Sequence, residues 1–188
     1  MNEPQLCKTV VAFDNGCTGS IAIIYPGGDA CWYPTPTKKC KNYQKTAHTI
    51  TRVNVNAMVS LLKEKIGDIP TDNLDVILER PYCNPQGFNA SLSAARALEA
   101  TLIALEAAGI VSYQFTASSA WQEVMLPKGT TGTKELKKAS YEVGKKLFPS
   151  VNFKKDADSL LMAEWARRKY IAMPVVKSAA KPKKVLDL

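Results

Sequence analysis

The chain has 188 residues, of which 46% are hydrophobic and 22% are charged. This length can bury one core but is short of two ordinary domains, so we expect a single domain. No apolar run approaches the roughly 20 residues that span a bilayer, and the first residues lack a secretory signal, which disfavours membrane and secreted proteins.

Cysteine and histidine usage restrict the chemistry further. The five cysteines are odd in number, unevenly spaced and without a CxxC pair, which indicates reduced thiols rather than disulfides or a zinc site. His48 is the only histidine, which excludes a metal site of several histidines. Any catalysis must therefore use carboxylates, hydroxyls, lysines or thiols.

The net charge of +8 is unevenly distributed. Residues 95–188 contain 16 Lys and Arg against 9 Asp and Glu, whereas residues 1–94 contain 9 against 8. A polyanion is a natural partner for the second half, although a solvated basic surface explains the charge equally well.

The first part of the chain has the pattern of three antiparallel strands. Apolar runs at residues 8–13, 20–25 and 30–33 are separated by glycine-containing turns. These connections are too short for crossovers, so the pattern predicts hairpins. Residues 35–49 are polar and basic and are expected to form a loop.

Helical spacing begins at residue 54. The pattern predicts a helix over 54–66, a strand over 74–78 that ends in Glu79, a long helix over 89–108 closed by Gly109, and a short strand over 111–115. The expected inward stripe of the long helix is Leu92, Ala95, Leu98, Leu102 and Leu105.

The last part of the chain is expected to be helical. Ser119 and Gln122 have the spacing of a capping box for a short helix. Further helices are predicted over 133–148 and 157–172, the first with Leu136, Ser140, Val143 and Leu147 inward. We expect Trp32, Trp121 and Trp165 to be core or interface residues rather than nucleic-acid contacts. The element order predicts an α/β domain over 1–172, with a mixed five-stranded sheet flanked by helices, and a flexible basic tail over 173–188.

Acidic residues occur where predicted elements end or begin. Asp14 and Glu79 end strands, and Asp156 and Asp158 begin the last helix. Each has a purely structural explanation: Asp14 as a turn former, Glu79 in an ion pair, Asp156 as a helix cap and Asp158 as a first-turn carboxylate. Together they could bind hard divalent ions, and two Mg²⁺ ions about 3.5–4 Å apart can support phosphodiester hydrolysis without histidine.

In this order, the segments resemble the RuvC-type Holliday-junction resolvases of the RNase H-like superfamily. The resemblance covers about residues 8–171. It rests on VVAFDNGCTGSIAII (10–24), VILERPY (76–82), SLSAARALEA (91–100), TGTKELKKASYEVGKKLF (131–148) and KKDADSLLMAEW (154–165).

The resemblance implies the RNase H-like fold and a metal-dependent endodeoxyribonuclease of recombination and repair, of phage or bacterial origin. Its substrate would be the four-way DNA junction, cut by paired symmetric nicks with two Mg²⁺ ions per site, for which Mn²⁺ can substitute. The active unit is expected to be a homodimer built on the 89–108 helix, because two equivalent nicks need two sites related by a two-fold axis. The expected location is the cytoplasm of a bacterial or phage-infected cell, or an organelle matrix.

Residue by residue, the resemblance implies metal ligands at Asp14, Glu79 and Asp158. The family's fourth ligand lies three residues before the last Asp, where this chain has Lys155. Asp156 could replace it only from outside the first helical turn. Lys134 is the expected catalytic lysine, and the implied DNA contacts are Arg80, Tyr82, Arg96, Lys128, Lys134 and Lys137.

Several alternatives stay open. Tyr82 could stack on a junction base or pack beside its neighbouring prolines, and the lysines of the 133–148 helix could form a solvated face. The departure at Lys155 allows a non-catalytic protein that binds branched DNA. The turn Asp14-Asn15-Gly16 also occurs in actin-like ATPases, but 188 residues cannot supply the two lobes of that class.

Overall fold

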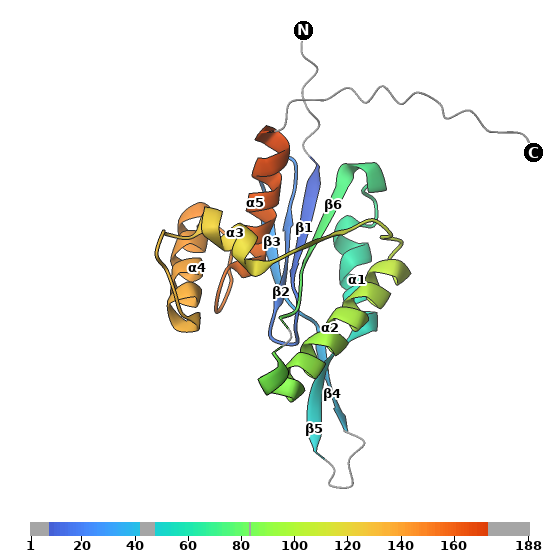
Figure 1. The fold of residues 1–188 in the computed structure, drawn as a ribbon. Coiled ribbons are helices and arrows are strands. Elements are labelled where there is room, and N and C mark those ends of the chain that lie inside the picture. Colours follow the sequence, from blue (N-terminus) through green and yellow to red (C-terminus); the bar gives the residue numbers. More distant parts are fainter. Residues whose placement is uncertain (1–7, 42–47, 83, 173–188) are drawn as a thin grey trace, which may run out of the picture.

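The computed structural model describes residues 8–41, 48–82 and 84–172, and the predicted tail at 173–188 lies outside them. A five-stranded sheet with the order β3-β2-β1-β6-β7 forms its centre (Figure 1). The strands are β1 (Thr9–Asp14), β2 (Ser20–Ile24), β3 (Ala30–Pro34), β6 (Leu74–Glu79) and β7 (Gln114–Thr116). Antiparallel pairing joins β1, β2 and β3, and parallel pairing joins β1 to β6 and β6 to β7. The predicted mixed sheet is therefore confirmed.

Helices cover both faces of this sheet (Figure 1). They are α1 (Val55–Ile66), α2 (Phe88–Ala107), α3 (Ser118–Met125), α4 (Thr133–Leu147) and α5 (Asp158–Ala172). Short 3₁₀ turns occur at Thr71–Asn73 and Pro85–Gly87. No helix of the described ranges is long and apolar enough to cross a membrane.

Alternate side chains of β1 enter two separate cores. Val10 and Ala12 pack with α5, whereas Val11 and Phe13 pack with α1 and α2. A sheet that is buried on both faces needs apolar residues at every position, which explains the continuous apolar runs of its central strands. The core on the α5 side includes Trp121 and Trp165, as predicted, and half-buried Trp32 packs against it.

The predicted loop at 35–49 is wrong in part. A separate two-stranded hairpin forms from β4 (Thr37–Lys41) and β5 (Thr49–Val53), and residues 42–47 lie outside the described ranges. The sequence of β4, TKKCK, contains no apolar alternation because most of this strand is exposed. Backbone pairing with β5, whose last residue Val53 is buried, therefore defines this strand.

The expected stripe of the long helix is confirmed in part, because Leu98, Leu102 and Leu105 join the core beside α1. Ala95 is exposed, whereas Ala97, Thr101 and Ala104 are buried together with Leu105. Small side chains contribute little to a hydrophobic pattern, although they let α2 approach the core closely.

Three further predictions are wrong in detail. Ser119 lies inside α3, whose N-cap is Ala117 and has no side-chain hydrogen bond, so no capping box forms. The last strand begins at Gln114 rather than at residue 111, and Val111 is 79% exposed. Leu147, expected to point inward, is exposed at the end of α4.

Candidate active site

Parallel pairing places two carboxylates at the same edge of the sheet. Phe13 of β1 is paired with Leu78 of β6, so the residues that follow them, Asp14 and Glu79, end neighbouring strands. The turn after Asp14 is tight, because a Cβ atom at Gly19 would collide with the Asp14 carbonyl oxygen. A small residue at this position is therefore needed to hold the Asp14 backbone where it is.

The remaining two carboxylates come from the entrance to α5. Asp158 is the first residue of this helix, and Asp156 lies before it, outside the first turn. One oxygen each from Asp14, Asp156 and Asp158 lies within 4.8 Å of the other two. Glu79 is not part of this group of three, but it is close enough to raise the pKa of Asp14.

Side chains of α4 hold the entrance of α5 in place. The buried Ser140 hydroxyl donates a hydrogen bond to Asp158 Oδ1 and accepts one, at 3.1 Å, from the backbone N–H of Ala157. The Lys137 ammonium lies 2.6 Å from Asp156 Oδ2 and 3.5 Å from Asp158 Oδ2. One turn of α4 therefore supplies both a hydroxyl and a positive charge to the acidic pair.

Burial and mutual repulsion make these carboxylates difficult to ionise. Burial, and then the charges of Glu79, Asp158 and Asp156, raise the pKa of Asp14 well above its usual value, against the opposing effect of Lys137. Burial, and then Asp158, raise the pKa of Glu79 to about 7, although the Trp121 indole and Lys137 oppose the rise. Burial also raises the pKa of Asp158, against the hydrogen bond from Ser140. One lysine does not balance four neighbouring carboxyl groups.

The donor set suits a hard divalent cation. All of the side-chain donors are carboxylate oxygens, which Mg²⁺ and Mn²⁺ prefer. Burial first, and then the neighbouring carboxylates, raise the pKa of Asp14 and of Asp158. A divalent cation bound to Asp14, Asp156 and Asp158 would remove this repulsion. The residues present therefore fit the metal that the sequence resemblance implies.

The predicted basic residues do not all lie at this cluster. Lys137 contacts the carboxylates, whereas Lys134, one turn earlier on α4, is exposed and has no such contact among the described residues. Arg96 lies on α2 beside the β4–β5 hairpin, and Lys128 is exposed in the loop between α3 and α4. Arg80 and Tyr82 follow β6 and are both exposed, with Tyr82 84% exposed.

Sequence reasoning missed two contributors to the cluster. Lys137 was expected only as a DNA contact, and Ser140 only as an inward-facing residue. The signal for Ser140 was a hydroxyl on the apolar stripe of the 133–148 helix, because a buried polar group needs a partner. Lys137 precedes Ser140 by three residues and therefore shares its side of the helix.

Comparison with known proteins supports the architecture. No protein-family model matches the chain, and no curated protein matches it. Among solved structures, the Thermus thermophilus RuvC structure is 13% identical with a TM-score of 0.50, and covers 87% of this chain and 96% of its own. T. thermophilus RuvC in complex with Holliday junction substrate is 15% identical with a TM-score of 0.49 and the same coverage. The chain therefore shares the RNase H-like α/β fold of RuvC, with a five-stranded mixed sheet and helices on both faces.

Proposed function

We propose that this protein is a metal-dependent endonuclease that cuts branched DNA, with the four-way junction as its substrate. The observation that carries the proposal is the convergence of Asp14, Asp156 and Asp158, with Glu79 beside them, at one edge of a RuvC-like sheet. The four carboxylates come from strand ends and a helix start that lie up to 144 positions apart in the sequence. Turn formation and helix capping explain each residue by itself, but they do not explain why the four carboxylates lie together.

In this proposal the four carboxylates hold two Mg²⁺ ions, for which Mn²⁺ can substitute. Bound divalent ions activate a water and stabilise the leaving oxygen in phosphodiester hydrolysis. Lys137 replaces Lys134 as the proposed catalytic lysine, because its ammonium already lies at the cluster and its side chain is 51% exposed. It can therefore turn toward a phosphate that binds beside the carboxylates and neutralise charge there.

The proposed DNA surface extends from the cluster over exposed cationic and aromatic side chains. Arg80 and Tyr82 follow the strand that carries Glu79, so they lie next to the proposed site in the chain. Base stacking on an aromatic side chain is worth roughly 1–3 kcal/mol, and the exposure of Tyr82 suits this role. Arg96, Lys128 and Lys134 are the remaining proposed contacts.

Paired nicks require two copies of the site, so we propose a homodimer that uses α2. This helix exposes Phe88 and Ile103, which are 71% and 47% accessible. A partner chain seated on α2 would cover both side chains. A monomeric mass at micromolar concentration would contradict this part of the proposal.

One observation favours a second candidate, a non-catalytic protein that binds branched DNA. Lys137 forms ion pairs with both Asp156 and Asp158, and Lys155 is exposed where the resembling family has a metal ligand. A lysine that neutralises two carboxylates competes with a metal ion for them. The two candidates share the fold and the DNA surface and differ only in cleavage.

Cleavage of an end-labelled four-way junction and its matched linear duplex, in Mg²⁺ or chelator, separates the candidates. We expect paired symmetric nicks in the junction alone, which require Mg²⁺, disappear in Asp14→Asn and persist in the control Asp29→Asn. Asp29 is exposed in the turn before β3, at the opposite end of β1. Tight junction binding without nicks in Mg²⁺ or Mn²⁺ would overturn the nuclease proposal and support the non-catalytic protein that binds branched DNA.

A further inference from the structure

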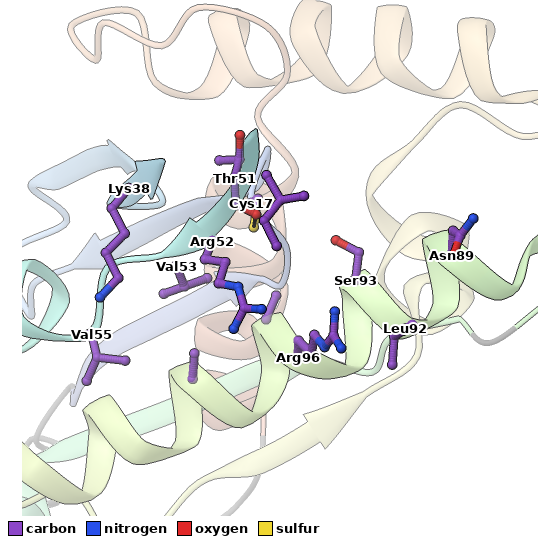
Figure 2. Close-up of a pocket in the computed structure, with 13 residues that line it drawn as sticks. Cys17, Lys38, Thr51, Arg52, Val53, Val55, Asn89, Leu92, Ser93 and Arg96 are labelled. Carbon is purple, nitrogen blue, oxygen red and sulfur yellow. Dashed lines mark hydrogen bonds between the residues drawn. The ribbon is translucent and has the colours of Figure 1, made fainter. Parts of the chain in front are cut away.

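The β4–β5 hairpin and α2 form the walls of a groove of about 530 Å³ (Figure 2). Lys38 and Arg52 line it from the hairpin, and Asn89, Ser93 and Arg96 line it from α2. Figure 2 shows the cationic ends of Lys38 and Arg52 on the hairpin side and that of Arg96 on the α2 side. Each wall thus carries cationic side chains, set among apolar residues such as Ile50, Val55 and Leu92.

The register of the hairpin places two positive charges directly opposite each other. Lys38 of β4 is paired with Arg52 of β5, so both side chains point to the same face of the hairpin. Like charges at opposed positions destabilise an antiparallel pair. Repulsion between these two side chains therefore destabilises the hairpin, and an anionic ligand bound in the groove would relieve it.

The lining of the groove contributes no carboxylate to offset the charges of Lys38 and Arg52. None of the lining residues is acidic, and buried Nε of Arg52 has no hydrogen-bond partner in the described part of the chain. Both acidic residues of α2, Glu99 and Glu106, are absent from the lining. A guanidinium NH that is shielded from water but unpaired indicates a missing acceptor.

The sequence shows the same bias over a longer range. Residues 30–53 contain five Lys and Arg and no acidic residue. The first half of the chain is otherwise rich in carboxylates, so its positive charge is concentrated in the hairpin and its surroundings. A local concentration of this kind attracts a polyanion.

The loop after Asp14 connects this groove to the carboxylate cluster. Asn15 donates a hydrogen bond to the Ala94 carbonyl of α2 at 3.3 Å, and the Cys17 thiol donates one to the Thr51 carbonyl of β5 at 3.5 Å. Cys17 itself lines the groove. A linear ligand that passes Asp14 can therefore continue between the hairpin and α2.

We propose that this groove binds the phosphodiester backbone of the DNA beyond the cleavage site, through Lys38 and Arg52 of the hairpin. This inference rests on the proposed function for the identity of the polymer and extends it to a second phosphate-binding surface. The hairpin contributes two phosphate contacts, and the guanidinium of Arg52 supplies the directional donors that a phosphate oxygen accepts.

The test is the salt dependence of junction binding, measured in chelator so that no cleavage occurs. The double variant Lys38→Gln/Arg52→Gln is compared with Lys8→Gln/Lys63→Gln, which loses the same charge. Lys8 precedes β1, and Lys63 lies in the last turn of α1, so both are at the opposite end of the parallel strands. A denaturation midpoint no lower than that of the unchanged protein establishes that each variant folds.

Loss of two phosphate contacts lowers the slope of log K against log salt by about 1.8, since each contact contributes about 0.9. The affinity deficit of the hairpin variant is then about 12-fold larger at 0.05 M than at 0.2 M salt. Arg52→Lys keeps the charge and is expected to retain the slope. Equal slopes for the hairpin and control variants would overturn the proposal that this groove binds the DNA backbone.

The outcome does not depend on whether the protein cuts DNA. If the unchanged protein cleaves junctions and the slopes are equal, DNA binding by the groove is refuted and the nuclease proposal is supported. If the slope falls only in the hairpin variant and no nicks form in Mg²⁺, the nuclease proposal is refuted. The groove is then a DNA-binding surface of a non-catalytic protein.

Discussion

Glu79 is expected to make the metal-free protein less stable as the pH rises. Its pKa is 4.5 in an exposed setting and about 7 in the folded protein. The folded state therefore binds this proton more tightly than the unfolded state does, and stability falls as the pH rises from about 4.5 to about 7. At about 1.36 kcal/mol per pKa unit, the loss approaches about 3 kcal/mol above pH 7.

Glu79→Gln removes this titration while it keeps the shape of the side chain. In chelator, we expect the variant to exceed the unchanged protein in free energy of unfolding by about 3 kcal/mol at pH 8 and to match it near pH 4. Urea denaturation across this pH range measures the difference, with the fluorescence of buried Trp121 as a probe beside the site. Glu123→Gln, on the exposed side of α3, is the control.

The difference in free energy of unfolding between Glu79→Gln and the unchanged protein must depend on pH if the folded state raises the pKa of Glu79. A constant difference from pH 4 to pH 8 would show that Glu79 titrates alike in the folded and unfolded states, and would refute the burial of its carboxyl group beside Asp158. Mg²⁺ should also stabilise the unchanged protein more than Glu79→Gln at pH 8, because a bound cation relieves the repulsion.

Other substitutions test the support around the cluster. Ser140→Ala should lower the free energy of unfolding by about 1–3 kcal/mol, because Ala157 N–H and Asp158 lose a buried partner, and urea denaturation measures this. Gly144→Ala should destabilise the protein despite the gain of about 1 kcal/mol in helix propensity, because the new methyl group would collide with Ala157, and Tm should fall. Lys137→Gln should tighten Mn²⁺ binding in a calorimetric titration without DNA, since a competing cation is removed, and slow junction nicking by about 100-fold. Unchanged nicking in this variant would assign Lys137 a purely structural role.

The part of the fold that the sequence predicts is the part that burial determines. The runs around Val11 and Ile77 are continuous because their strands are covered on both faces, and the strand positions follow from them. The hairpin at Thr37–Lys41 and Thr49–Val53 escaped prediction because β4 is largely exposed and Val53 is the one buried residue of β5. The predicted stripe of α2 was incomplete because Ala97 and Ala104 carry almost no hydrophobic signal.

Some residues of the candidate site could be predicted from the sequence, and others depend on how the helices pack. Asp14 and Glu79 could be found because acidic residues that close apolar runs are unusual at strand ends, and Asp158 because it starts a helix. The contacts of Lys137 and Ser140 could not be found, because they depend on how α4 packs beside α5. Sequence spacing relates residues within one helix and does not set the distance between two helices.

The position of α5 at the end of the described chain has a consequence for the order of synthesis. All five strands of the sheet are complete by Thr116, about forty residues before Asp158 is made. Until α5 packs against β1 and β2, the sheet lacks much of its cover on one face and the cluster lacks two of its carboxylates. A nascent chain thus carries Asp14 and Glu79 without the partners that would let them hold a metal. The proposed cutting of DNA is thereby withheld until synthesis has passed the last helix and the core has closed.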